Sequence, residues 1–325
     1  MASSNADRAL GFAGMVLFAS TVASRASAQP QQAEGFAVDR FYTSAPGGGW
    51  FVMDDLAMRG GLGGGMAMTT DYASNPLRVA GGSQPLAVVS NQATADFGFA
   101  VTYDRWRLYL NLDAPLLNKG QNGMVGDYRF TAPSVDLGSK PDALSDVRIG
   151  LDTRLLGSPT GAFRLGASAQ LLVPEGSSSD YETDGTVRAM VRALVAGDVG
   201  PIAYAGQLGV HIRPFDGSPT PGSPEGSELL YGIAAGARFP VVGDAVVVIG
   251  PEVYGETAFK AFLGSTTTGL EALLTSRVEG TRDNGAQVRV KLGTGGGIDP
   301  NFGAPEWRAV LSVEVFDHGA KAPKP

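Results

Sequence analysis

Apolar and polar residues alternate along most of the chain from about residue 60 onward. Residues 146–155 show this most clearly, because Val147, Ile149 and Leu151 occupy one row of the alternation. The other row is mostly ionic and contains Asp146, Arg148, Asp152 and Arg154. Successive side chains of a β-strand point to opposite faces, so a period of two predicts a strand with one apolar and one polar face.

Twelve segments carry this alternation. Several of them are 11 to 14 residues long, whereas strands of globular proteins usually have about five or six residues. The predicted strands are 60–72, 85–103, 106–114, 145–156, 161–174, 185–198, 201–213, 228–240, 244–256, 267–279, 285–294 and 305–316.

The connections between these strands alternate in length. Five are tight turns rich in Gly, Pro, Asp or Asn, at 104–105, 157–160, 199–200, 241–243 and 280–284. The other six are longer, at 73–84, 115–144, 175–184, 214–227, 257–266 and 295–304. Transmembrane β-barrels of the outer-membrane type have short periplasmic turns and long extracellular loops. An even number of strands places both ends of the barrel on the periplasmic side.

A soluble two-sheet sandwich, such as a secreted binding module, is the main alternative for this pattern. Strands of this length suit a tilted crossing of a bilayer, which takes about 9 to 11 residues. The polar row also contains Gly, Ala and Ser between its charged residues, which suits a confined lumen better than an open face. Strands can satisfy all their backbone groups in lipid only within a closed barrel. The sequence therefore favours an all-β fold, a transmembrane antiparallel β-barrel of about twelve strands.

The first 28 residues have the pattern of a Sec-type signal peptide. An apolar run at 9–23 precedes Ala26-Ser27-Ala28, a small-x-small cleavage site. The run is short for a membrane-spanning helix, which needs about 20 residues. We therefore expect a signal peptide at 1–28, an N-terminal periplasmic segment at 29–59, the barrel at 60–316 and a Lys/Pro-rich periplasmic tail at 317–325. The expected location is the outer membrane of a Gram-negative bacterium.

Composition narrows the range of functions. The net charge of −7 argues against a nucleic-acid binder. The chain has no cysteine, which excludes disulfides and thiolate metal sites, and its two histidines leave little for a zinc site. We expect no cofactor, no metal and no catalytic residue. The expected partners are outer-membrane lipid and the barrel-assembly machinery.

The polar rows of the predicted strands would face the barrel interior. The predicted lumen-lining residues are Asp146, Arg148, Asp152, Arg154, Arg164, Arg188, Arg192, His211, Arg213, Glu228, Arg238, Glu252, Glu271, Arg277, Glu279, Arg289, Lys291, Arg308 and Glu314. Buried charges need ion pairs or water, so two interpretations remain open. A packed polar network would make the barrel a structural element of the envelope. A water-filled lumen would make it a passive diffusion pore for ions or small solutes.

Three further features bear on chemistry. His211 is expected to be one more lining residue and not a general base. The pair Asp54-Asp55 before the first strand is interpreted as a solvated turn. The acidic spacing at Asp180, Glu182 and Asp184 is poor evidence for a calcium site.

Short stretches in a fixed order resemble a known family. They are FAVDRF at Phe36–Phe41, WFVMDDLAMRG at Trp50–Gly60, YASNPLRV at Tyr72–Val79, DGTVR at Asp184–Arg188, GSELLYG at Gly226–Gly232 and GAPEWRAVL at Gly303–Leu311. They are similar to the barrels of myxobacterial OmpA-family outer-membrane proteins, over roughly residues 36–316. The resemblance implies an outer-membrane barrel. That family commonly carries a peptidoglycan-binding domain after the barrel, whereas this sequence ends in a Lys/Pro tail, so contact with the cell wall is not carried over.

Overall fold

The structure is a computed structural model and describes residues 30–80, 85–215, 224–282, 285–299 and 303–317. The predicted signal peptide and the predicted tail beyond residue 317 lie outside the described residues. The helical pieces of the described part are two three-residue 3-10 turns, Ser178–Asp180 and Phe259–Ala261. No helix among these residues is long and apolar enough to cross a membrane.

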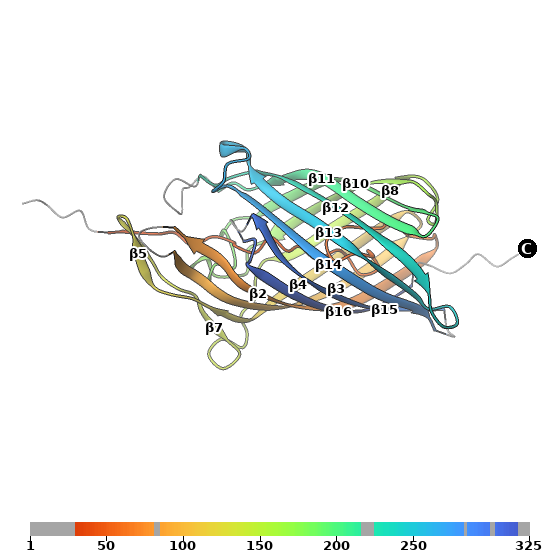
Figure 1. Cartoon of the computed structure of the whole chain (residues 1–325), viewed down its shortest axis with the longest axis horizontal. Coiled ribbons are helices and arrows are strands. Elements are labelled where there is room, and N and C mark those ends of the chain that lie inside the picture. Colours follow the sequence, from red (N-terminus) through yellow and green to blue (C-terminus); the bar gives the residue numbers. More distant parts are fainter. Residues whose placement is uncertain (1–29, 81–84, 216–223, 283–284, 300–302, 318–325) are drawn as a thin grey trace, which may run out of the picture.

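Twelve long strands form one closed antiparallel barrel (Figure 1). Each strand pairs with the next of the twelve, and the last pairs with the first, where Val310 lies opposite Asp71. The strands are β2 (Leu62–Val79), β3 (Leu86–Tyr103), β4 (Trp106–Lys119), β8 (Val147–Leu156), β9 (Arg164–Val173), β10 (Arg188–Val199), β11 (Ile202–Ile212), β12 (Glu228–Pro240), β13 (Val246–Ala258), β14 (Thr268–Thr281), β15 (Gln287–Asp299) and β16 (Trp307–Asp317). The predicted twelve-stranded transmembrane barrel is confirmed.

Three predicted strands are too short, and one of them, β15, continues to Asp299 and not to residue 294. β2 continues to Val79 and not to residue 72, although its pairing with β3 shifts register between Ser74 and Leu77. Asn75 in this stretch has a positive φ of 52°, which interrupts the regular alternation there. β4 likewise continues to Lys119, into a region that was predicted to be a loop.

The two ends of the barrel differ. At one end, called the short-turn end, the chain reverses between β3 and β4, β8 and β9, β10 and β11, β12 and β13, and β14 and β15; β2 also begins and β16 also ends there (Figure 1, right). The opposite, long-loop end carries the short strands β5 (Gly123–Val125), β6 (Tyr128–Phe130) and β7 (Ser134–Asp136). In barrels of this type the short turns face the periplasm.

The wall of the barrel has an apolar outside and a polar inside. On β11 the outward side chain of Leu208 is 56% exposed, and on β12 that of Ile233 is 68% exposed. His211 on the inner face of β11 is fully buried, and so is Arg308 on β16. An apolar outer row suits contact with acyl chains, and the polar row encloses the interior.

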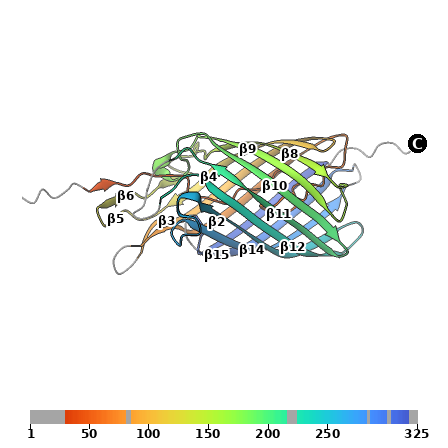
Figure 2. The same ribbon diagram turned by 90° about the horizontal axis from the view of Figure 1, so that it is seen from above.

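Residues 33–58, here called the lumen segment, run through the barrel interior. Just before them, β1 (Gln31–Gln32) pairs in parallel with β6 at the long-loop end (Figure 2). The segment then passes along the inside and leads into β2 at the short-turn end. The expected periplasmic segment at 29–59 is therefore corrected for these residues. The physical reason is that its apolar side chains, such as Trp50 and Phe51, are buried against the inner wall.

Candidate functional site

The lumen segment folds into a tight hairpin near the short-turn end. The N–H of Ser44 donates to the carbonyl of Phe51 (2.7 Å), and the N–H of Asp55 donates to the carbonyl of Gly48 (2.6 Å). Gly49 has a φ of +95°, and a Cβ there would lie 2.7 Å from Nη1 of Arg277. The positive φ is the reason that this position favours glycine.

The barrel wall makes room for the apolar side chains of this hairpin. A Cβ on the inward glycines of the wall would collide with the segment: at 2.8 Å from Trp50 for Gly236, at 2.6 Å from Phe51 for Gly293 and at 2.7 Å from Met53 Sδ for Gly232. Small alanines of β10, β11 and β12 belong to the same buried cluster, namely Ala196, Ala203, Ala205 and Ala234. These small residues form sockets that hold the hairpin.

Glu252 on β13 holds the tip of the hairpin by its backbone. Its Oε1 accepts the N–H of Phe51 at 2.9 Å, and its Oε2 accepts the N–H of Val52 at 3.0 Å. The hydroxyl of Thr275 also donates to Oε1 at 2.7 Å. Glu252 is fully buried, so these three hydrogen bonds are what stabilises its carboxylate away from water.

Asp54 is buried and ion-paired with Arg107. Arg107 on β4 also contacts Asp152 of β8, with its Nη2 at 2.9 Å from Oδ2. The neighbouring Asp55 is buried as well. The interpretation of Asp54-Asp55 as a solvated turn is therefore wrong, because both carboxylates lie inside the barrel, where arginines can neutralise them.

Two wall arginines bind backbone carbonyls of the lumen segment. Arg148 donates to the carbonyl of Thr43 (3.0 Å) and to its hydroxyl (2.6 Å). Arg154 donates to the carbonyls of Leu56 (3.1 Å) and Met58 (2.5 Å). The irregular backbone of the segment thus finds its hydrogen-bond partners in side chains of the wall.

Arg308 on β16 gathers three carboxylates. It forms ion pairs with Asp71 of β2, with Glu271 of β14 (2.9 Å) and with Asp39 of the segment (3.0 Å). Its guanidinium carbon also lies 4.8 Å from the ring centroid of Phe41, a distance at which the cation is attracted to the ring. One wall side chain therefore links two strands and the segment.

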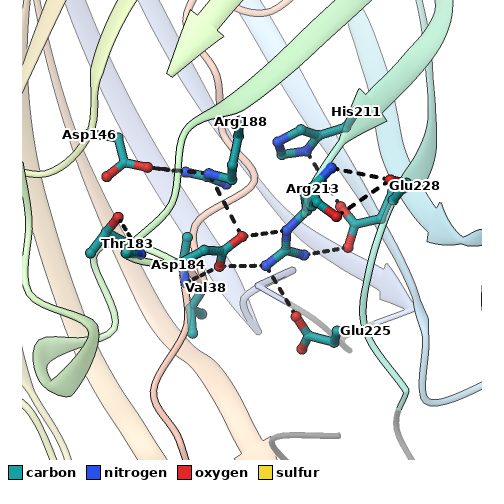
Figure 3. A network of polar contacts seen from close by, with 12 residues as sticks. Val38, Asp146, Thr183, Asp184, Arg188, His211, Arg213, Glu225 and Glu228 are labelled. Carbon is teal, nitrogen blue, oxygen red and sulfur yellow. Dashed lines mark hydrogen bonds and ion pairs between the residues drawn. The ribbon is translucent and has the colours of Figure 1, made fainter. Parts of the chain in front are cut away.

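A second network lies toward the long-loop end (Figure 3). Arg213 contacts Asp184 (2.7 Å), Glu228 (2.7 Å) and Glu225 (3.1 Å). Burial would raise the pKa of Asp184, but the charge and hydrogen bonds of Arg213 outweigh it and hold this pKa well below its ordinary value. No hydrogen bond to Glu225 is found among the described residues, and burial prevails over the charge of Arg213 and raises the pKa of Glu225 to about 8.

Arg40 connects the segment to this network. It lies 3.2 Å from Glu228 and 3.3 Å from Glu256. His211 Nδ1 lies 3.1 Å from Glu256 Oε2, and the ring packs edge-on against Tyr42 with centroids 5.7 Å apart. His211, Glu228 and Glu256 could offer ligand atoms to a metal ion. Because the guanidinium groups of Arg40 and Arg213 already pair with these carboxylates, we interpret the cluster as an ion-pair network.

The acidic loop residues Asp180, Glu182 and Asp184 do not form a calcium site, because their carboxylates have separate partners. Asp180 pairs with Lys140 and Asp184 pairs with Arg213. Glu182 accepts hydrogen bonds from Asn118 (2.6 Å) and Ser145 (2.5 Å). Burial raises the pKa of Glu182 to about 7, so this carboxyl is partly protonated at neutral pH.

The structure places the nineteen predicted lumen residues inside the barrel or at its rims. Seventeen are buried, and Arg238 and Glu279 are half-buried near the short-turn end. Eleven contact the lumen segment: Arg148, Arg154, Arg188, His211, Glu228, Glu252, Arg277, Arg289, Lys291, Arg308 and Glu314. The other eight bond to wall or loop side chains: Asp146, Asp152, Arg164, Arg192, Arg213, Arg238, Glu271 and Glu279.

Sequence reasoning missed the lumen segment and several of its wall partners. Two missed wall residues, Arg107 and Glu256, are buried and pair with Asp54 and Arg40 of the segment. Asp71 and Asp96 were also missed, and these buried carboxylates pair with arginines of the wall. A signal for the segment was present in the stretch Trp50–Met53, four consecutive apolar residues that a water-exposed segment would not keep. Beside the segment, the interior retains small cavities of about 20 Å³ and 40 Å³, room for a few waters at most.

Comparison with known proteins identifies the fold. No protein-family model and no curated protein matches the chain. An outer membrane channel from Pseudomonas putida F1 is similar in structure, with a TM-score of 0.51, 13% identity, and coverage of 81% of this chain and 98% of that one. The NanC porin has a TM-score of 0.46 and 6% identity, over 77% of this chain and 98% of that one. The fold is that of outer-membrane β-barrels, and the narrower resemblance to myxobacterial OmpA-family barrels stays a prediction.

Proposed function

We propose that this chain is an outer-membrane barrel with a structural role in the envelope, and that its own lumen segment keeps it closed. The observation that carries the proposal is the position of the hairpin at Ser44–Asp55 in the interior, where the wall residue Glu252 binds its backbone. The apolar outer face supports the membrane location, because a row of exposed leucine, isoleucine and valine side chains is costly in water.

Electrostatics supports a closed ground state. A wide polar lumen without the segment would have to hydrate Arg148, Arg308 and Glu252, which now find partners in the segment. Removing one partner from a buried ion pair is strongly destabilising. The segment and the charged wall therefore stabilise each other, and the occupied lumen is the resting state.

Planar bilayers test this proposal. The purified chain without its signal peptide is expected to show no discrete conductance. A variant lacking residues 30–58, checked for heat-modifiable migration on a gel as evidence of a folded barrel, is expected to conduct. Discrete channels from the unaltered chain would overturn the closed state, and silence from a folded deletion variant would show that the segment is not what closes the lumen.

A passive diffusion pore is the second candidate, in which the segment leaves the lumen to let ions or small solutes pass. Two observations favour it. The segment is held by hydrogen bonds, ion pairs and packing, without a strand pairing to the barrel wall in its inner part, and the structurally similar Pseudomonas protein carries the description of a channel. Rare, brief openings of the unaltered chain that become frequent when a contact to the segment is removed would favour this function over a purely structural one.

A further inference from the structure

A cavity of about 290 Å³, here called the vestibule, opens at the short-turn end. Its lining combines residues of the lumen segment, such as Trp50 and Asp55, with inward residues of seven wall strands, β9 to β15, and the turns between them. A water molecule takes up about 30 Å³ in the liquid, so the vestibule has room for a solute of several heavy atoms. In a barrel of this type this end faces the periplasm.

Arg277 on β14 lines the vestibule and lacks a hydrogen-bond partner among the described residues. Its side chain is 2% exposed, and its Nε and Nη1 are buried without a hydrogen bond. Its nearest carboxylate is that of Glu279, at 3.9 Å from Nε. Its guanidinium carbon lies 5.0 Å from the ring centroid of Trp50. A buried charged donor without an acceptor is costly, so this side chain points to an anionic partner.

The carboxylates around the vestibule have other partners. Asp198 pairs with Arg164 and Arg238, each at 2.9 Å. Glu279 lies 2.8 Å from Arg289. Asp244 accepts the backbone N–H of Thr281 at 2.8 Å, on the exposed side of the turn.

The charges that line the cavity also favour an anion. Five arginines and four carboxylates line it: Arg59, Arg164, Arg238, Arg277 and Arg289, with Asp55, Asp198, Asp244 and Glu279. Arg59 is exposed, whereas Arg277 is buried. An incoming anion would therefore find one preorganised guanidinium, backed by the face of Trp50, that no carboxylate of the wall satisfies.

We propose that the vestibule is a binding site for a small oxyanion, a carboxylate or phosphate group that accepts hydrogen bonds from Arg277. Guanidinium groups are suited to both ligands, because their planar donors match the oxygens of carboxylate and phosphate. This proposal rests on the proposed function in one respect. Trp50 belongs to the lumen segment, so the site is complete only while the segment occupies the lumen and the barrel is closed. A bound anion would therefore add to the contacts that hold the hairpin in place.

Calorimetric titration of the detergent-solubilised chain tests the site, with inorganic phosphate and benzoate as separate probes and sodium chloride at matched ionic strength as reference. Saturable binding of either probe is expected, and the two arms show which anion the site prefers. Arg277→Gln is expected to weaken binding at least tenfold. Arg59→Gln, which removes an exposed arginine from the same vestibule, is expected to leave the affinity within about twofold. Heat-modifiable migration checks that both variants are folded.

Three outcomes would overturn the site. The first is a heat response to both anions that does not saturate, and the second is equal affinity in the unaltered chain and the Arg277→Gln variant. The third is a loss of affinity in Arg59→Gln as large as that in Arg277→Gln, which would mean general attraction by positive charge. If Arg277→Gln does not fold, Arg277→Lys, which keeps the charge and loses the planar donors, replaces it with the same expected loss. The measurement needs no conductance, so a conducting chain that still binds the anion through Arg277 would refute the closed state and keep the site.

Discussion

The contact between Glu252 and the hairpin allows the strength of closure to be measured. Glu252→Gln keeps the size of the side chain but replaces one acceptor oxygen by an NH₂ group, which then faces a backbone N–H of Phe51 or Val52. The variant loses one hydrogen bond to a charged group, about 1.5–3 kcal/mol, and leaves a buried donor unpaired, about 1–3 kcal/mol. With the lumen segment displaced, water would solvate either side chain, so the loss falls on the closed state.

A total loss of about 3 kcal/mol corresponds to a roughly hundredfold rise in the ratio of open to closed barrels. The absence of cysteine from the chain gives a clean assay for this ratio. Ala45 of the hairpin is buried, so an Ala45→Cys thiol reacts with a maleimide only when the segment leaves the wall. The labelling rate is therefore expected to be about a hundredfold higher when Glu252→Gln is combined with Ala45→Cys.

Asp146→Asn in the same Ala45→Cys background is the matched control. Asp146 is a buried lumen carboxylate that pairs with Arg188 of the wall at 2.6 Å and not with a residue of the lumen segment. This control is expected to change the labelling rate by less than about threefold. A similar rate in the Glu252→Gln variant and in the control would refute the assignment of Glu252 as the residue that holds the hairpin.

Further predictions concern packing, pH and ion pairs. Trp50→Ala empties a buried socket and is expected to raise the labelling rate of Ala45→Cys at least as much as Glu252→Gln, because such truncations cost about 3–5 kcal/mol. Burial raises the pKa of Glu182 from 4.5 to about 7, so between these pH values the folded barrel holds a proton that the unfolded chain releases. The midpoint temperature of heat modification should therefore decrease as the pH rises from 4.5 to 7, and Glu182→Gln should remove this decrease. Arg308→Met leaves three carboxylates without their arginine and should cost about 3–5 kcal/mol of stability, whereas Arg238→Met, at a side chain that is 37% exposed, should leave the midpoint nearly unchanged.

The barrel wall could be predicted from the sequence because its structural rule is local. An alternation such as that of residues 146–155 states directly which side chains face lipid, and a tight turn such as 104–105 fixes where the chain reverses. One failure of the rule lies where the backbone departs from it. In β2, Asn75 with its positive φ and the following Pro76 break the period, and the strand resumes beyond them to Val79.

The lumen segment could not be predicted in the same way, because its backbone has no period of its own. Its carbonyls and N–H groups bond to side chains far away in the sequence, as Thr43 does with Arg148 and Val52 with Glu252. Such pairings leave no trace in the local pattern. The charged lumen residues could be predicted from the strands alone, and their contacts with the lumen segment could not.

The small inward residues of the wall give the strongest reason to regard barrel and segment as one unit. At Gly293 the three atoms nearest to a Cβ all belong to Phe51 of the hairpin, so a water-filled lumen would tolerate a larger side chain there. At Gly236 and Gly232 the hairpin residues Trp50 and Met53 lie at 2.8 Å and 2.7 Å from a Cβ, beside atoms of the wall itself. In the structure each of these glycines faces an apolar side chain of the hairpin at a distance that excludes even a Cβ. The wall therefore has the complementary shape of the segment as well as its complementary charges. In an open barrel these sockets would be exposed to water, and Trp50, Phe51 and Met53 would lose their buried contacts. Packing therefore favours the occupied lumen independently of the ion pairs.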